Sequence, residues 1–319
     1  MQGAYHRVAV HLRKASTAVV CGHVRPDGDA VASVLALTLA LRGVGVAAVP
    51  TLADDRDPPS TYAFLPGHAL YTPASDLEAP DVFVAVDTPI PERLGVARDL
   101  AHAAATRVVI DHHPDALPWG DVNILDAEAA ASAQIVWRLL DPLEAPITPE
   151  LAFCCYVGLM TDTGRFQFQN TSADALRDAA AMVERGASPS EAARLVYQER
   201  SAASLAIEAI AMQRLTIAND GHVAWTYLND DDFERTGALP EEAEHIPDAI
   251  RALGGVEAVA LLRVRDGIVR GNLRAKGSED VATAARALGG GGHVAAAGFT
   301  WEGGLEPLLD TLLPLLPGG

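Results

Sequence analysis

The chain has 319 residues, enough for two domains, and its 49% hydrophobic and 21% charged residues predict a globular protein with a substantial core. The formal net charge of −18 argues against binding of long nucleic acid, which needs many Lys and Arg contacts to phosphates. The three cysteines, Cys21, Cys154 and Cys155, are too few for a disulfide framework and favour a reducing cytoplasm. Residues 1–25 contain no signal-peptide core, and no apolar run approaches the length of about 20 residues that a membrane span requires. We therefore expect a soluble cytoplasmic protein that does not enter a membrane.

The first half of the chain alternates short β-branched runs with helical patterns. Residues 17–21 predict a strand, which leads into an apolar helix over residues 29–41. Three more strands are predicted at residues 45–50, 82–86 and 107–110, and one more helix is predicted at residues 92–104. Strands that alternate with helices indicate parallel βαβ units, so the sequence predicts an α/β fold with an open, mainly parallel sheet flanked by helices.

The second half begins with helical patterns and then changes character. Helices are expected at residues 130–140, 149–160, 172–185 and 188–196, and residues 205–214 are expected to form a linker helix. Two hairpins follow, one around Asn219-Asp220-Gly221 and one around Asp266-Gly267. We therefore predict a first domain over residues 1–195, a linker helix over 196–214 and a smaller mixed α+β domain over 215–319.

Four groups of His and Asp residues lie where predicted strands or helices of the first domain end. In open α/β sheets, ligands bind at the carboxyl ends of the strands. Taken singly, each group has an ordinary explanation as a turn or a helix cap. Three strand ends that each deliver an oxygen or imidazole ligand are hard to produce by turn chemistry alone. The groups are His23-x-x-x-Asp27-Gly28-Asp29, then Asp87, then Asp111-His112-His113, and finally Asp162.

The ligand types indicate which metal this cluster would prefer. Imidazoles mixed with carboxylates, without a thiolate, suit Mn²⁺, Fe²⁺, Co²⁺ or Mg²⁺ better than a structural zinc ion. Six candidate ligands are too many for one octahedral ion that also keeps water and substrate. They suit two ions that share a carboxylate and lie about 3.5–4 Å apart, which is an arrangement used in phosphoryl transfer.

These motifs resemble the signature of the DHH phosphoesterase superfamily, which includes RecJ-like exonucleases and family II inorganic pyrophosphatases. The resemblance covers nearly the whole chain, because the glycine run at residues 289–292 with His293 is similar to the motif of the DHH-associated domain. The chain is most similar to the bacterial nano-RNase and pAp phosphatase group (NrnA-type), where pAp is 3′-phosphoadenosine 5′-phosphate. Residues 158–164, with Phe166 and Asn170-Thr171, also resemble that group.

The resemblance implies a role for each site residue. Two divalent cations, Mn²⁺ before Mg²⁺, Co²⁺ or Fe²⁺, are expected, with a bridging water as the nucleophile. Asp111 and His113 are the expected catalytic residues. Asp111 is expected to orient a liganding histidine, and His113 is expected to face the substrate phosphate. The expected ligands are His23 and Asp27 for one ion, Asp29, His112 and Asp162 for the other, and Asp87 as the bridge.

The second domain carries the predicted substrate-binding residues. Backbone N–H groups in a glycine run can approach an anion closely, although flexible loops are the commoner reason for such runs. Arg274 and Lys276 form a rare basic spot in an acidic chain with only two lysines. The substrate residues predicted here are Arg274, Gly290, Gly291, Gly292 and His293.

Several functions are compatible with this pattern. The leading hypothesis is hydrolysis of short single-stranded RNA or DNA oligonucleotides and of pAp. The alternatives are an inorganic pyrophosphatase, which the missing Arg-Lys-Lys run disfavours, and a nucleotide-sensing module without catalysis, which the complete ligand set disfavours. A processive exonuclease is disfavoured because the chain has no extended basic stretch. The sequence leaves open whether the chain forms a homodimer.

Overall fold

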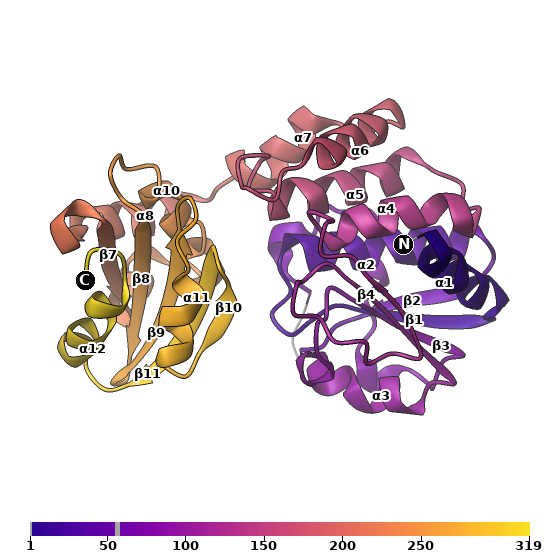
Figure 1. Ribbon diagram of the computed structural model, residues 1–319, viewed down its shortest axis with the longest axis horizontal. Coiled ribbons are helices and arrows are strands. Elements are labelled where there is room, and N and C mark those ends of the chain that lie inside the picture. Colours follow the sequence, from indigo (N-terminus) through magenta and orange to yellow (C-terminus); the bar gives the residue numbers. More distant parts are fainter. Residues whose placement is uncertain (1, 55–57) are drawn as a thin grey trace. The chain divides into compact units, whose positions relative to one another are not determined.

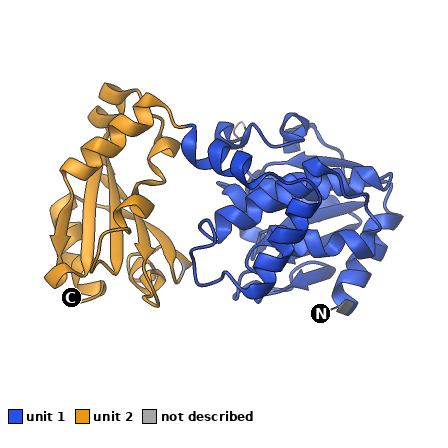
Figure 2. Cartoon of the chain, turned by 90° about the horizontal axis from the view of Figure 1, so that it is seen from above, with its two compact units in different colours: residues 1–199 blue, residues 200–319 orange. Residues whose placement is uncertain are grey.

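A computed structural model describes residues 2–54 and 58–319 of the chain. The chain divides into two compact units, Met1–Glu199 and Arg200–Gly319 (Figure 2). Each unit has its own sheet and its own hydrophobic core. The predicted α/β fold class is confirmed.

The first unit is built on a five-stranded parallel sheet (Figure 1). All four predicted strands are present, and the structure adds the short edge strand β5, which the sequence analysis missed. The strands lie in the order β2-β1-β3-β4-β5, with the bounds β1 Thr17–Cys21, β2 Ala47–Thr51, β3 Val82–Val86, β4 Thr106–Asp111 and β5 Val122–Leu125. Since β1 pairs with both β2 and β3, the chain leaves β1 towards one side of the sheet and continues from β3 towards the other. This reversal of strand order is the place where open α/β sheets bind ligands.

Helices cover both faces of this sheet. One face carries the large core, in which α2 is buried along almost its whole length because it lies between the sheet and other helices (Figure 1). The other face carries a smaller core with α3 (Arg98–Ala103). The helices on the large-core side are α1 Gln2–Lys14, α2 Gly28–Gly43, α4 Ser132–Leu143, α5 Pro149–Asp162, α6 Ala173–Glu184 and α7 Pro189–Ala193.

Two local predictions about helices differ from the structure. The continuous helix expected over residues 92–104 is a 3₁₀ segment, Pro91–Ala97, followed by α3, because the backbone of Gly95 has a non-helical φ of 46°. Helix α1 was not predicted. Its polar residues obscured the apolar pattern, yet Val8 and Leu12 are fully buried in the core. Both differences leave the predicted site residues in place.

The second unit is a six-stranded mixed sheet with both predicted hairpins, β6-β7 and β8-β9. Helices α11 (Val281–Ala287) and α12 (Leu305–Leu312) pack on one core, while α8 (Ala202–Gln213) and α10 (Ile246–Ile250) pack on another. Helix α9 (Asp230–Thr236) follows β7. The strands lie in the order β10-β11-β9-β8-β7-β6, with the bounds β6 Thr216–Ala218, β7 Val223–Asn229, β8 Ala258–Arg265, β9 Ile268–Ala275, β10 Gly291–His293 and β11 Ala296–Glu302.

The units differ slightly from the predicted domains. Along the chain, the boundary between the two units falls after Glu199. Helix α8, which the prediction placed in a linker, packs on a core of the second unit. The division by function into residues 1–195, 196–214 and 215–319 stays a prediction. Over residues 2–54 and 58–319, none of the helices combines the length and apolar character needed to cross a bilayer.

Candidate metal centre

Three strand ends of the first unit supply the His and Asp residues predicted to hold metal. His23, Asp27 and Asp29 follow β1, Asp87 follows β3, and the Asp111-His112-His113 run begins at the last residue of β4. Asp162 is the last residue of α5. Their donor atoms form groups of three that lie within 4.8 Å of one another. The structure therefore brings all six predicted ligands together at the point where strand order reverses.

The first group consists of His23, Asp27 and Asp87. The Nε2 atom of His23 lies 3.4 Å from Oδ2 of Asp87 and 4.0 Å from Oδ2 of Asp27. The Nδ1 atom of His23 lies 2.8 Å from the Val24 carbonyl oxygen, which directs Nε2 towards the carboxylates. Asp27 also caps α2, since its Oδ1 accepts a hydrogen bond from the Ala30 N–H. Its capping role, the ordinary explanation for such a residue, thus coexists with membership of the cluster.

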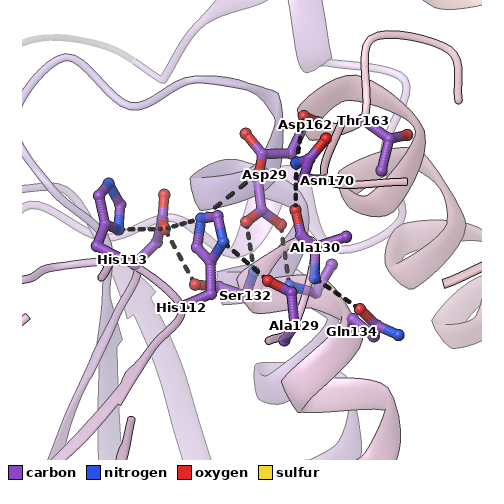
Figure 3. Close-up of polar contacts among 12 residues, drawn as sticks. Asp29, His112, His113, Ala129, Ala130, Ser132, Gln134, Asp162, Thr163 and Asn170 are labelled. Atoms are coloured by element: carbon purple, nitrogen blue, oxygen red, sulfur yellow. Dashed lines mark hydrogen bonds and ion pairs between the residues drawn. The ribbon is translucent and has the colours of Figure 1, made fainter. Parts of the chain in front are cut away.

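The second group consists of Asp29, His112 and Asp162 (Figure 3). The Nε2 atom of His112 lies 3.5 Å from Oδ2 of Asp162 and 3.6 Å from Oδ1 of Asp87. The Nδ1 atom of His112 lies 3.3 Å from the Ala129 carbonyl oxygen. Asp87 thus contacts one histidine of each group, the position required of a bridging carboxylate.

His113 belongs to a third group, with Asp87 and His112, and it is also paired with Asp111. The Nδ1 atom of His113 lies 2.9 Å from Oδ1 of Asp111, which also accepts a hydrogen bond from the His113 backbone N–H. The same Nδ1 atom lies 3.6 Å from Oδ1 of Asp87. Asp111 is fully buried, and its Oδ2 has no hydrogen-bond partner among the described residues. Asp111 therefore orients His113, whereas the prediction assigned it a more general orienting role for a liganding histidine.

The geometry of the two groups fits divalent cations. Ligand–metal distances of about 2.1 Å allow two ligands of one ion to lie up to about 4.2 Å apart. The measured separations of 3.4–4.0 Å between imidazole and carboxylate donors fall within this limit. Liganding histidines commonly direct their second ring nitrogen to a carbonyl or carboxylate, as both His23 and His112 do here. The residues therefore fit the predicted ions.

The pKa values of the carboxyl groups in the centre shift in opposite directions. Burial raises the pKa of the Asp29 carboxyl to about 7, and the charge of Asp87 adds to this effect. Burial, together with the charges of neighbouring carboxylates, also raises the pKa of Asp162 well above its ordinary value. For Asp87, burial opposes ionisation, but the contact with His23 and the charges of the imidazoles lower its pKa far below the usual range.

The three imidazoles respond to the same crowding. Burial alone lowers the pKa of a histidine, yet the pKa values of His23 and His112 are raised because of Asp87. The pKa of His113 is raised mainly through its hydrogen bond with Asp111, again against the effect of burial. The carboxylates thus favour the protonated, positively charged form of each imidazole.

Close helix packing and backbone strain both occur at the centre. A side chain at Gly158 of α5 would meet the Ala133 Cβ at 2.6 Å and Oδ1 of Asp29 at 2.8 Å, so only glycine permits this approach. Asp87 has a left-handed backbone with φ of 57°, which is uncommon for a residue other than glycine and typical of functional sites. The sequence analysis missed Ser132, whose hydroxyl donates to Oδ1 of Asp87. The available signal was a single serine within a run of alanines at residues 129–133.

The predicted substrate residues of the second unit lie on neighbouring strands. Gly291, Gly292 and His293 form the edge strand β10 rather than an open loop. Gly292 is required there, since a Cβ would meet the Ala296 carbonyl oxygen at 2.6 Å. Ala296 of β11 pairs with His293 on one side and with Arg274 of β9 on the other. Gly290 directly precedes β10, and the side chain of His293 lies outside the part of the chain that the structure describes.

Comparisons with known proteins match this architecture. Residues 17–159 match the DHH family, N-terminal domain, and residues 220–315 match the DHHA1 domain. The chain is 32% identical over 287 residues to a bifunctional oligoribonuclease and PAP phosphatase NrnA of Thermus thermophilus, covering 89% of this chain and 84% of the relative.

Two solved structures share the fold. An exopolyphosphatase-related protein from Bacteroides fragilis superposes with a TM-score of 0.91 at 21% identity, covering 98% of this chain and 94% of that protein. Exonuclease RecJ bound to manganese superposes with a TM-score of 0.57 at 18% identity, covering 98% and 94%. At these identities the likeness establishes the fold alone.

Together, the parallel sheet, the His and Asp groups at its carboxyl edge and the DHHA1 match define a metal-dependent phosphoesterase, a hydrolase of phosphoester bonds. The chain belongs to the DHH family and is of the NrnA type.

Proposed function

We propose that this protein hydrolyses short oligoribonucleotides to mononucleotides and pAp to AMP. The observation that carries the proposal is the set of three overlapping His and Asp groups at the sheet's switch point, in which Asp87 belongs to two groups and His112 joins them to the third. The activity named for the Thermus thermophilus relative supports the choice of substrate. Short single-stranded DNA would be a further substrate of the same chemistry.

The ion proposed for the centre is Mn²⁺, with Mg²⁺, Co²⁺ and Fe²⁺ as substitutes. Mixed imidazole and carboxylate donors without thiolate support this class of ion. Two bound cations supply Lewis acidity towards a phosphoryl oxygen and make a water nucleophilic near neutral pH. We propose that His23 and Asp27 hold one ion, that Asp29, His112 and Asp162 hold the other, and that Asp87 contacts both.

The remaining residues of the centre would act on the substrate. Asp111 fixes the ring of His113, so this imidazole can donate a hydrogen bond to a phosphoryl oxygen in a constant direction. In the second unit, Arg274 and the β10 residues Gly291, Gly292 and His293, with Gly290, are proposed to bind the nucleotide. The net charge of −18 supports a preference for substrates of about two to five nucleotides, because distant phosphates would be repelled.

Product analysis tests the proposal directly. Purified protein with Mn²⁺ would be given 5′- and 3′-labelled oligoribonucleotides of about two to twenty residues, pAp and pyrophosphate, with Asp87→Ala as the inactive control. We expect mononucleotides from the shortest oligomers and AMP from pAp. Preferred cleavage of pyrophosphate would identify an inorganic pyrophosphatase instead, and nucleotide binding without turnover would identify a sensor.

Two further expectations belong with this proposal. The three cysteines are buried with free thiols, which supports the proposed cytoplasmic location. Homodimerisation is tested by light scattering of the purified protein, in which a mass of twice 33.5 kDa would establish the dimer.

A further inference from the structure

Residues 129–133, at the entrance to α4, contact both proposed metal groups. Figure 3 shows Ala129, Ala130 and Ser132 beside Asp29 and His112. Residues 129–133 are not proposed ligands, and all five are buried. They contact three of the six proposed ligands directly, namely Asp29, Asp87 and His112, and are linked through Asn170 to the backbone of a fourth, Asp162. An inference about this segment rests on the proposed metal-binding role of those residues.

The first contact joins α4 to Asp29 of another helix. The residue at the N-cap of α4 is Ala131, which has no side chain able to cap the helix. Asp29 supplies the missing acceptor, since its Oδ2 accepts a hydrogen bond from the Ser132 N–H at 2.6 Å and its Oδ1 accepts one from the Ala133 N–H at 2.9 Å. Helix N-termini favour negative charge, so α4 holds this carboxylate in one orientation.

The second contact joins the same residue to the other metal group. The hydroxyl of Ser132 donates to Oδ1 of Asp87 at 3.0 Å, and Ser132 is fully buried. Its main chain therefore holds Asp29 while its side chain holds Asp87. One residue thus sets the distance and angle between the carboxylate proposed for one ion and the carboxylate proposed to be shared by both.

The preceding residues extend the support to the other two ligands. The carbonyl oxygen of Ala129 lies 3.3 Å from Nδ1 of His112. The carbonyl oxygen of Ala130 accepts a hydrogen bond from Nδ2 of Asn170, which also donates to the carbonyl oxygen of Asp162. Gln134 keeps the segment in place by accepting a hydrogen bond from the Ala130 N–H.

We propose that Ser132 is a positioning residue that fixes Asp29 and Asp87 relative to each other, so that both proposed ions bind with high affinity. Residues around metal ligands typically change metal affinity by about 10- to 100-fold when they are replaced. The serine hydroxyl contributes one such contact, and the backbone of the same residue contributes another. Replacement by alanine removes only the hydroxyl contact and leaves the cap on α4.

The test compares Mn²⁺ binding of the wild type, Ser132→Ala and Ser204→Ala by titration calorimetry of metal-free protein. Ser204 is a matched control, because it is also buried and its hydroxyl donates to the Glu242 carbonyl oxygen within the second unit. We expect Ser132→Ala to weaken Mn²⁺ binding about 10- to 100-fold, while Ser204→Ala binds like the wild type. We also expect excess Mn²⁺ to restore much of the lost turnover of Ser132→Ala, with KM for the substrate unchanged.

Several outcomes separate the inference from the proposed function. Unchanged Mn²⁺ affinity in a folded Ser132→Ala overturns the positioning role, even if the wild type cleaves short RNA. Weakened affinity supports it, even if the preferred substrate proves to be pyrophosphate. Should Ser132→Ala fail to fold, Asn170→Ala provides the second variant, since Asn170 is exposed and bridges the segment to Asp162. Its Mn²⁺ affinity must then fall, and a value equal to the wild type overturns the role of residues 129–133.

Discussion

The proposed metal ligands of the first unit and the proposed substrate residues of the second unit differ in how the protein holds them. Asp29, Asp87 and His23 are each no more than 5% exposed, and their side chains contact one another or a helix end. Arg274 is half-buried on a sheet strand, and its guanidinium donates a hydrogen bond to the carbonyl oxygen of the neighbouring Leu273. The side chains of the first site are thus held by one another and by neighbouring backbone, to a greater extent than Arg274 is.

The two sites also differ in how much charge they concentrate. The metal centre gathers carboxylates that repel one another when they are deprotonated. A bound cation would offset this repulsion. The β10 strand owes its shape to glycines that pack against β11, with no comparable concentration of charge. Substitutions in the first site should therefore change chemistry and metal content, whereas those in the second should change substrate affinity.

The largest effect is expected from Asp87→Ala. Asp87 contacts a histidine of each group, His23 through Oδ2 and His112 through Oδ1. We expect hydrolysis of every substrate to be abolished while the far-ultraviolet circular dichroism remains that of the folded protein. Asp141→Ala, which removes an exposed carboxylate from α4, is the control. Retention of more than about a tenth of wild-type turnover by Asp87→Ala would exclude a bridging role.

A comparison of His112→Ala with His113→Ala sharpens the assignment within the centre. His112 faces Asp162 and Asp87 through Nε2, whereas His113 is held by Asp111 through Nδ1. We expect His112→Ala to lose about one of two bound ions, and His113→Ala to keep both while its turnover falls. Metal content after dialysis, measured by mass spectrometry, decides the matter. An equal loss of metal in both variants would make His113 a ligand, as its 3.6 Å distance to Asp87 permits.

A smaller, selective effect is expected from Arg274→Ala. A charge-assisted contact to phosphate contributes about 1.5–3 kcal/mol, so KM for 5′-phosphorylated dinucleotides should rise roughly 10- to 100-fold. Cleavage of bis-p-nitrophenyl phosphate should scarcely change, because that substrate lacks a second phosphate to bind. Arg265→Ala, at the exposed end of β8 in the same sheet, is the matched control. Equal damage to both substrates would contradict a substrate-binding role for Arg274.

Features of this molecule that depend on local sequence patterns could be predicted from the sequence. The strand ends after residues 21, 86 and 111 were predictable because β-branched runs mark the strands and parallel strands end at one edge. The contact between Asp29 and α4 was not predictable, since it joins residues more than one hundred positions apart. The same is true of the edge strand β10, where pairing with β11 overrides the loop tendency of a glycine run.

The smallest effect is expected in the pH dependence of stability. In metal-free protein, burial raises the pKa of Asp29 to about 7 and also raises the pKa of Asp162. Above about pH 4 the folded state therefore binds more protons than the unfolded state, and the free energy of unfolding falls as pH rises. The raised pKa values of His23, His112 and His113 act in the same direction, because their contribution is present below about pH 6.5 and is lost at higher pH. The lowered pKa of Asp87 matters only in strong acid.

The Tm of the EDTA-treated protein should therefore fall between about pH 5.5 and 8, by several degrees, since 1 kcal/mol corresponds to about 2–4 °C in a domain of this size. With Mn²⁺ the slope should reverse, because ligands must be deprotonated to bind the ion. Asp162→Asn cannot ionise at this position, so its metal-free Tm should depend less on pH than that of the wild type. Scanning calorimetry in matched buffers measures all three slopes. A metal-free Tm that rises with pH over this range would show that the carboxylates of the centre are ionised and satisfied without a cation, and the proposed contrast between the two sites would then be wrong.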